Sequence, residues 1–225
     1  MDFTKTVAVV TGGNRGLGLR FAEQLIERGA KVYAAARRPE AVELAGAVPL
    51  RLDLTDQASI GEAAALASDA TFLINNAGIS THTALIDGSF DNIRLEMETH
   101  YFGTLAATRA FAPVIERNGG GAVLNILSVL SWVHVSAYGA YCAAKSASWA
   151  MSNVLREELR PKGIHVASLH VGYMATDMAD YVAPEDKVDP AAVAKAGLDG
   201  VAAGANEIIA DEKSRRAKEN LGVAL

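Results

Sequence analysis

Short apolar runs alternate along the chain with longer segments in which apolar residues recur at helical spacing. The first run, KTVAVVT, has the continuity that is typical of a strand covered on both faces of a sheet. The runs predict seven strands, at residues 5–11, 31–36, 48–52, 71–75, 121–127, 164–170 and 207–210. Helices are predicted at residues 19–28, 56–68, 91–117, 138–160, 190–203 and 211–220, with Pro113 breaking or kinking the third.

This regular alternation predicts how the elements assemble. Strands that alternate with helices form a parallel sheet with helices on both faces. We therefore predict an α/β fold with a doubly wound, mostly parallel seven-stranded sheet. The chain has no internal repeat, low-complexity linker or break in composition, and half of its residues are hydrophobic. A single domain over residues 1–225 is expected.

Charge and cysteine content exclude several functional classes. The net charge is −5 and the basic residues are scattered, so a basic face for nucleic acid is not expected. The single cysteine, Cys142, cannot form an internal disulfide and is expected to be a buried helix thiol, which is compatible with a reducing compartment. No apolar run approaches the roughly 18 residues of a membrane span, and the start resembles a strand entering a turn rather than a signal peptide. We expect a cytoplasmic protein that does not bind membranes.

A glycine-rich turn joins the first predicted strand to the first helix, reading TGGNRGLG over residues 11–18. Glycines there allow a tight turn, a close approach of the backbone to a pyrophosphate, and close packing of helix on strand. The helix N-terminus that follows offers amide donors and the positive end of its dipole to phosphates. The turn indicates dinucleotide binding, although a glycine trio alone is also compatible with a plain tight turn.

Proton-transfer chemistry is suggested by Ser128, Tyr141 and Lys145. If Tyr141 lies on a helix, Lys145 lies one turn away on the same face. A free tyrosine has a pKa near ~10, and a close cation can stabilise the phenolate by roughly 4 kcal/mol, which would bring that pKa to about 7. Such a phenol can exchange a proton with an oxygen that Ser128 hydrogen-bonds. The same pair also occurs by chance on helix surfaces, where tyrosine packs along the lysine stem.

The glycine turn, the NNAG sequence at residues 75–78 and the tyrosine–lysine pair occur in this order. The set resembles the short-chain dehydrogenase/reductase family over essentially the whole chain. The resemblance implies a Rossmann fold, a nicotinamide dinucleotide, no metal, and interconversion of a ketone or aldehyde with its alcohol. By resemblance, Tyr141 handles the proton of the substrate oxygen, Lys145 lowers the pKa of Tyr141 and holds the nicotinamide ribose, and Ser128 orients the substrate oxygen. The implied cofactor-binding residues are Gly12, Asn14, Arg15, Gly16, Leu17, Gly18, Arg37, Asp53, Leu54, Asn76, Ala77, Gly78, Tyr141, Lys145 and Thr176.

The end of the second predicted strand favours one cofactor. A carboxylate there would bind the ribose 2′-hydroxyl of NAD, whereas an arginine accommodates the 2′-phosphate of NADP. The strand ends in Ala36, followed by Arg37 and Arg38, and Arg15 in the glycine turn adds another cation. These arginines favour NADP(H), the alternative being a pair of solvated loop arginines.

Two positions depart from the family pattern. His100 stands where the family usually has an asparagine that helps hold a water of the proton relay, and His170-Val171-Gly172 replaces a segment with proline. We hypothesise that His100 substitutes in the relay; the alternative is a hydrogen-bonded helix histidine without a catalytic part. Loss of the proline removes a restraint on φ and is expected to loosen the wall beside the nicotinamide.

The segment between Gly172 and Asp189 is short and polar, so an open cleft and a broad or bulky carbonyl substrate are expected. Ser131 and Ser136 are possible substitutes for Ser128, but only Ser128 follows the fifth strand at the family's spacing. By resemblance, the two long helices pair in a homodimer or homotetramer. The candidate apolar walls are Trp132, Val133, Val135, Tyr138, Tyr173 and Met174, of which Trp132 and Met174 are equally suited to the core.

The leading prediction is an NADP(H)-dependent oxidoreductase that acts on a small-molecule ketone or aldehyde and its alcohol. The alternative is a catalytically impaired NADP(H)-binding regulatory or sensor protein, because the fold alone does not guarantee chemistry. The intact Ser128, Tyr141 and Lys145 set opposes that alternative, and only the replacement at His100 favours it. A purely structural module explains neither the arginines nor the tyrosine–lysine pair.

Overall fold

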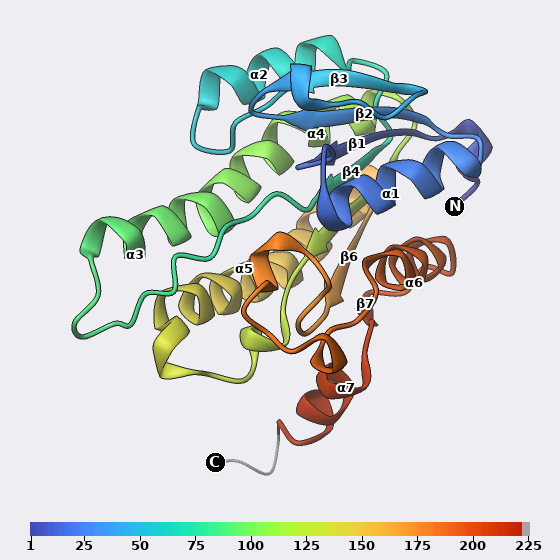
Figure 1. Cartoon of the computed structure of the whole chain (residues 1–225). Coiled ribbons are helices and arrows are strands. Elements are labelled where there is room, and N and C mark those ends of the chain that lie inside the picture. The colour runs from blue at the N-terminus through green and yellow to red at the C-terminus, as the bar shows by residue number, and fades with distance from the viewer. Residues whose placement is uncertain (222–225) are drawn as a thin grey trace.

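A seven-stranded sheet, in which every strand is parallel to its neighbours, runs through the computed structural model, which describes residues 1–221 (Figure 1). The order across the sheet is β3-β2-β1-β4-β5-β6-β7. The predicted α/β, doubly wound fold is confirmed, and the sheet is wholly rather than mostly parallel. The predicted domain of residues 1–225 includes residues 222–225, which lie outside the described residues. The strands are β1 (Val7–Thr11), β2 (Lys31–Ala36), β3 (Ala47–Arg51), β4 (Phe72–Asn75), β5 (Gly121–Ile126), β6 (Ile164–His170) and β7 (Glu207–Ile209).

Helices cover both faces of this sheet (Figure 1). One face carries α1 (Gly16–Glu27) and α6 (Pro190–Ala202), and the other carries α2 (Gln57–Leu66), α4 (Thr104–Arg117) and α5 (Gly139–Leu159). The remaining helices are α3 (Phe90–Met97), which precedes α4, and α7 (Glu212–Glu219), which follows β7. Within residues 1–221, no helix is both long enough and apolar enough to cross a membrane.

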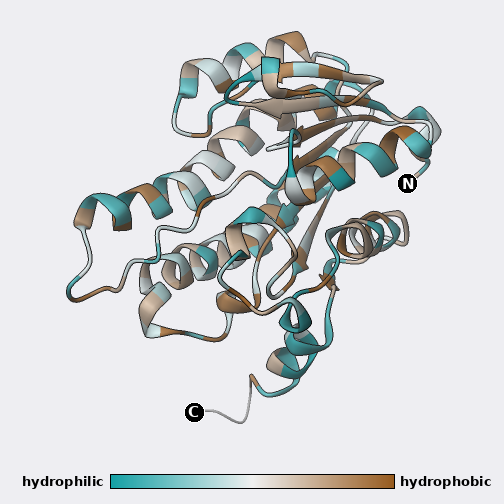
Figure 2. Cartoon of the chain, in the orientation of Figure 1, coloured by the Kyte–Doolittle hydropathy of each residue, from teal (hydrophilic) through white to brown (hydrophobic). Residues whose placement is uncertain are grey.

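The strands are buried on both sides, which explains their continuous apolar sequences. Val9 packs in the core layer under α4 and α5, whereas its neighbour Val10 packs in the layer under α1 and α6, and both are fully buried. Successive strand residues point to opposite faces, so one apolar run supplies both layers. Figure 2 shows this concentration of hydrophobic residues in the sheet and the hydrophilic character of α7 at its edge.

The predicted helix 91–117 is interrupted in its middle rather than at Pro113. A π-helical segment, Glu98–Gly103, separates α3 from α4, and Pro113 lies inside α4, which continues to Arg117. The wide turn brings the backbone of Gly103 close to the segment that follows β3. A Cβ on Gly103 would lie 2.6 Å from the carbonyl oxygen of Leu54 in that segment. π-helical turns are rare and are frequent at functional sites.

The crossovers place the carboxyl ends of β1, β4 and β5 side by side. The chain moves from β1 outward to β2 and β3, then returns to the other side of β1 to form β4 and β5. In open α/β sheets, ligands bind in the crevice outside the carboxyl ends of the strands at this switch point. The glycine turn, the NNAG sequence and Ser128 follow β1, β4 and β5 respectively, so they meet there.

Candidate active site

The glycine turn has a backbone that side chains would obstruct. Gly12 and Gly16 have φ values of +66° and +54°, and a Cβ on Gly18 would lie 2.1 Å from the carbonyl oxygen of Gly12. Leu17 is buried in the core and Asn14 is half-buried in the turn. Arg15 occupies the N-cap of α1 without a side-chain capping bond, so the first amides of this helix remain available to phosphate oxygens.

The NNAG sequence is hydrogen-bonded to the glycine turn. The Thr11 hydroxyl accepts hydrogen bonds from the backbone amides of Asn76 (2.9 Å) and Ala77 (3.0 Å), and the side-chain amide of Asn76 donates to the Thr11 carbonyl (2.9 Å). Asn75 is buried, and its side-chain amide donates to Asn125 Oδ1 on β5 at 2.8 Å. The two asparagines therefore have different structural roles. Asn75 links β4 to β5, and Asn76 holds the loop after β4 against the glycine turn.

Other predicted cofactor-binding residues surround the same edge. Arg37 is exposed just beyond β2, and Leu54 is buried beyond β3. The Asp53 carboxylate accepts from the amide (3.0 Å) and hydroxyl (2.8 Å) of Thr55. A Cβ on Gly16 would lie 3.5 Å from Thr176 Cγ2, so the segment after β6 touches the turn. Open amides, obligatory glycines and an arginine at the strand tip fit a dinucleotide with a 2′-phosphate.

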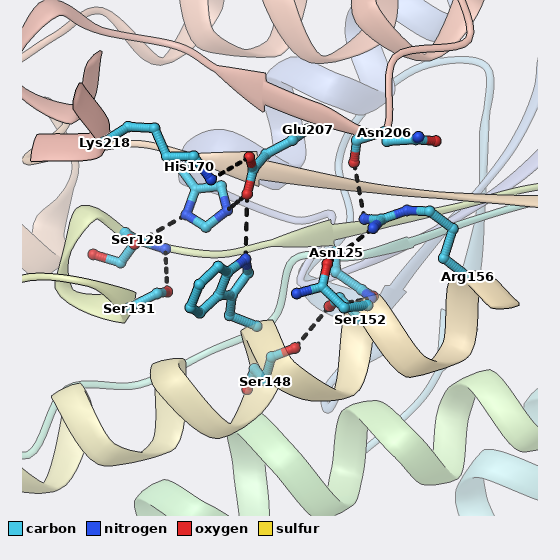
Figure 3. Close-up of polar contacts among 12 residues, drawn as sticks. Asn125, Ser128, Ser131, Ser148, Ser152, Arg156, His170, Asn206, Glu207 and Lys218 are labelled. Carbon is cyan, nitrogen blue, oxygen red and sulfur yellow. Dashed lines mark hydrogen bonds and ion pairs between the residues drawn. The ribbon is translucent and has the colours of Figure 1, made fainter. Parts of the chain in front are cut away.

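Ser128 is fixed by the local turn after β5. Its hydroxyl accepts a hydrogen bond from the Leu130 amide at 3.1 Å, and its own amide donates to the Ser131 hydroxyl at 3.4 Å (Figure 3). This reciprocal arrangement is a capping box on a short 3₁₀ helix. Ser131 therefore supports Ser128 rather than replacing it, and Ser136 is exposed.

Tyr141 and Lys145 lie one turn apart on α5, as their spacing predicts. Lys145 Nζ lies 5.6 Å from the centre of the Tyr141 ring and donates to the carbonyl of Ile126 at 2.9 Å. Burial lowers the pKa of Lys145 to about 8, against the attraction of Glu96. Burial also raises the pKa of Tyr141, although the Ser128 hydrogen bond acts in the opposite direction. The negative charge of Glu96 acts in the same direction as burial, so the net shift of the Tyr141 pKa is upward. The lowering of that pKa by Lys145, which the family resemblance implies, stays a prediction.

His100 stands beside Tyr141. Its ring contacts Tyr141 edge to face, with centroids 5.2 Å apart, and its backbone carbonyl accepts from the Ser148 hydroxyl at 2.9 Å. A Cβ on Gly78 would lie 2.6 Å from the His100 ring, so the glycine of NNAG makes room for it. Burial and the neighbouring Lys145 lower the pKa of His100.

His170 lies next to Ser128 (Figure 3). It is fully buried, its Nδ1 lies 3.3 Å from the Ser128 carbonyl, and its ring stacks on Trp132 at 3.8 Å. Its Nε2 lies 3.2 Å from Glu207 Oε1, which also accepts from Trp149, and Lys218 on α7 binds the other oxygen. Trp132 is thus core packing, not a cleft wall. These contacts hold the His170 side chain in place; the loosening expected from the loss of the proline stays a prediction.

An aromatic group, defined as His82, Tyr138, Tyr173 and Tyr181, forms around Tyr181. Tyr181 lies 4.9 Å from His82, 6.3 Å from Tyr138 and 6.2 Å from Tyr173 between ring centroids. Tyr173 and Tyr181 lie close enough to Tyr141 for electrostatic interaction. The roles of Tyr138 and Tyr173 as cleft walls stay predictions. His82 and Tyr181 were not predicted. His82 has a φ of +52°, a strained conformation for a non-glycine residue.

The comparisons with known proteins agree with this geometry. Residues 6–187 match the family model of short chain dehydrogenases. The chain is 33% identical over 192 residues to "Dehydrogenase/reductase SDR family member 7B" of Bos taurus, covering 77% of this chain and 59% of that protein. It is 32% identical over 184 residues to the NADPH-dependent 1-acyldihydroxyacetone phosphate reductase of Schizosaccharomyces pombe, covering 78% and 62%. The chain thus spans about 60% of the length of these two curated relatives.

A solved structure gives the same result over the full chain. A short chain dehydrogenase from Burkholderia cenocepacia in complex with NADP is 36% identical, with a TM-score of 0.95 and coverage of 100% of this chain and 95% of that one. This likeness extends over the whole of the chain in both fold and sequence. The chain belongs to the short-chain dehydrogenase/reductase family of oxidoreductases.

Proposed function

We propose that the protein is an NADP(H)-dependent carbonyl reductase or alcohol dehydrogenase that interconverts a ketone or aldehyde with its alcohol. The observation that carries this proposal is the convergence of Ser128, Tyr141 and Lys145 at the carboxyl end of β5, next to the glycine turn. The relative from Burkholderia cenocepacia is a complex with NADP, and the Schizosaccharomyces pombe relative is an NADPH-dependent reductase. Both support NADP(H) over NAD(H).

The residues supply proton transfer and orientation. The bound cofactor gives or accepts the hydride at the substrate carbon. The Ser128 hydroxyl donates a hydrogen bond to the substrate oxygen, and Tyr141 donates its phenolic proton to that oxygen during reduction. Because burial raises the pKa of Tyr141, the phenol is protonated at neutral pH and ready to act as an acid. Lys145, buried with a pKa of about 8, and His100 pass a proton back to Tyr141.

Cofactor choice rests on Arg15 and Arg37. No carboxylate follows β2 directly, since Arg37 and Arg38 come after Ala36. The cationic guanidinium groups suit a 2′-phosphate, which they bind through charge-assisted hydrogen bonds. Asp53 and Leu54 border the adenine in this proposal, Asn76, Ala77 and Gly78 pass along the ribose, and Thr176 binds the carboxamide.

Three further properties belong to the proposal. The substrate is a broad or bulky carbonyl compound, because the aromatic group beside Tyr141 offers a large apolar wall. A homodimer or homotetramer forms through α4, α5 and the π-helical segment, where Phe102 and Val154 are 51% and 56% exposed. The protein acts in the cytoplasm, and its single cysteine is compatible with that compartment.

The proposal is tested by following the consumption of NADPH and of NADH by absorbance, with a panel of ketones and aldehydes as substrates. NADPH-dependent turnover that disappears in Tyr141→Phe, with NADPH binding retained, supports it. Tight NADPH binding without turnover on any carbonyl favours the regulatory alternative. His100→Ala then tests the relay: unchanged turnover with an unchanged pH profile would remove His100 from the mechanism.

A further inference from the structure

Glu96, on α3 just before the π-helical segment, is a charged residue with no exposure to solvent. A carboxylate removed from water loses several kcal/mol of hydration and needs compensating partners. The next acid along the chain, Glu98, is exposed. Burial of Glu96 is therefore specific to its position and calls for an explanation.

The two oxygens of Glu96 have different partners. Oε1 accepts hydrogen bonds from the backbone amide (2.5 Å) and the hydroxyl (2.9 Å) of Thr81, in the loop after β4. Oε2 lies 3.3 Å from Nε2 of His100, at ion-pair distance but outside hydrogen-bond geometry. One oxygen is thus satisfied by the loop, and the other is left facing the histidine beside Tyr141.

The surroundings fix the tautomer of His100. Its Nε2 lies 2.9 Å from the carbonyl oxygen of Ile79, and a carbonyl can only accept. Nε2 therefore carries a hydrogen, which the Ile79 carbonyl and the Glu96 carboxylate both face. Nδ1 is then the basic nitrogen, the one that takes up and releases a proton.

The charges around His100 oppose one another. Burial and Lys145 disfavour the imidazolium and lower the pKa of His100. Glu96 favours the imidazolium and acts to raise that pKa. Glu96 also favours the charged form of Lys145 and disfavours ionisation of Tyr141. The same carboxylate therefore acts on all three proton-carrying groups, and its pairing holds its own pKa below the usual value.

We propose that Glu96 is a positioning residue that acts through His100: it holds the ring with hydrogen on Nε2 and stabilises the proton that Nδ1 takes up during the relay. This inference rests on the proposed oxidoreductase function. In the reduction, Tyr141 gives its proton to the substrate oxygen and takes one from the Lys145 ammonium. Neutral His100 accepts a proton from solvent at Nδ1 and passes it through the relay to the Lys145 amine, so that His100 ends neutral. Glu96 stays a carboxylate throughout, as does the acid of an acid–histidine pair in other enzymes.

The first test needs neither cofactor nor substrate. In the wild-type protein labelled with ¹⁵N histidine, NMR reads the tautomer of neutral His100, and the Nε2–H form is expected. In Glu96→Gln, which keeps the shape and loses the charge, His100 is expected to titrate at a lower pH. A neutral His100 with hydrogen on Nδ1, or an unchanged titration in Glu96→Gln, overturns the proposal. If Glu96→Gln does not fold, the wild-type tautomer still decides.

The second test separates positioning from loop stabilisation. We expect Glu96→Gln to lower kcat by about tenfold and move the alkaline decline of carbonyl reduction to lower pH, with little change in the KM for NADPH. Glu98→Gln is the matched charge control, and Thr81→Val removes one loop contact without touching His100. Both should keep the wild-type pH profile.

The double variant gives the decisive comparison. In a His100→Asn background, Glu96→Gln should lower kcat much less than in the wild type, because the group it acts through is gone. Its direct effect on Lys145 should still move the pH profile. The same loss in both backgrounds, or a Thr81→Val variant that reproduces the pH change, would assign Glu96 to the loop and overturn the proposal. Loss of activity in Tyr141→Phe tests the proposed function separately, so the two failures are distinguishable.

Discussion

Arg15 Nη1 lies 2.9 Å from Asp177 Oδ2, which pairs the cation of the glycine turn with the segment after β6. The two side chains are 69% and 75% exposed, so the pair is weak and water competes for it. Arg15 is one of the arginines proposed to bind the 2′-phosphate of NADP. The carboxylate of Asp177 therefore competes with the cofactor for the same guanidinium group.

Asp177→Asn is expected to tighten NADPH binding. The substitution removes an exposed ion pair that is worth about 0.2–1 kcal/mol, so Arg15 no longer has to leave Asp177 when the cofactor binds. This corresponds to a Kd for NADPH that is roughly one-and-a-half- to fivefold lower. NADH, which has no 2′-phosphate, should bind as before. Fluorescence titration with both cofactors at low salt measures this, with Asp180→Asn, an exposed neighbour, as the control. An equal gain for NADH would show that Arg15 does not contact the 2′-phosphate.

Gly18→Ala is expected to damage both stability and cofactor binding. The new methyl group would lie 2.1 Å from the Gly12 carbonyl oxygen and 2.6 Å from the Asn76 side-chain amide, so the turn must move away from α1. Overpacking of this kind costs about 1–3 kcal/mol. Urea unfolding and NADPH titration should both report the loss.

Gly61→Ala is the matched control, because Gly61 lies in α2 with nothing within 4 Å of its would-be Cβ. Alanine in a helix is favoured over glycine by about 0.5–1 kcal/mol, so this variant should gain stability. Unchanged stability and NADPH affinity in Gly18→Ala would mean that the turn is looser than its contacts indicate.

Local sequence patterns were sufficient for the sheet and for the phosphate turn. Apolar continuity marks strands such as β1 because both faces of the sheet are covered, and the glycine turn is identified by its place between a strand and a helix. The Tyr141–Lys145 relationship follows from helical spacing alone. These features depend on residues that are close together in the sequence, so they can be predicted from the sequence.

Burial in the candidate site could not be predicted in this way. Glu96 lies two residues from exposed Glu98 and resembles it in sequence, but the loop that carries Thr81 folds over only one of them. Desolvation likewise sets the direction of the Tyr141 pKa, and it depends on distant segments. The π-helical turn at His100 has no periodic signal, since its neighbours on both sides are ordinary helices.

Tyr181→Ala is expected to weaken binding of bulky carbonyl substrates. Tyr181 contacts His82, Tyr138 and Tyr173 and is 53% exposed, so its ring is available to a ligand beside Tyr141. Aromatic contacts contribute about 0.5–1.5 kcal/mol beyond area burial, which predicts a KM higher by roughly two- to tenfold for aromatic ketones. A small aldehyde serves as the internal control. A KM that rises equally for both substrates would assign Tyr181 to the fold rather than to substrate binding.

Lys145 predicts an unusual pH dependence of stability in the cofactor-free protein. Its folded pKa of about 8 lies below the ordinary lysine value of 10.5, so between these values the unfolded chain binds a proton that the folded chain has released. The free energy of unfolding must then rise with pH, by on the order of 2 kcal/mol between pH 8 and about 9.5. Urea unfolding of the wild type and Lys145→Met over this interval isolates the effect, because the methionine variant lacks the titrating group. Lys162→Met, at a half-exposed lysine, should retain the wild-type slope. If the stability of the wild type and of Lys145→Met changed in parallel with pH, Lys145 would be fully charged in the folded protein over this interval. Its pKa would then not be lowered by burial, and Tyr141 would have a fully charged cation beside it.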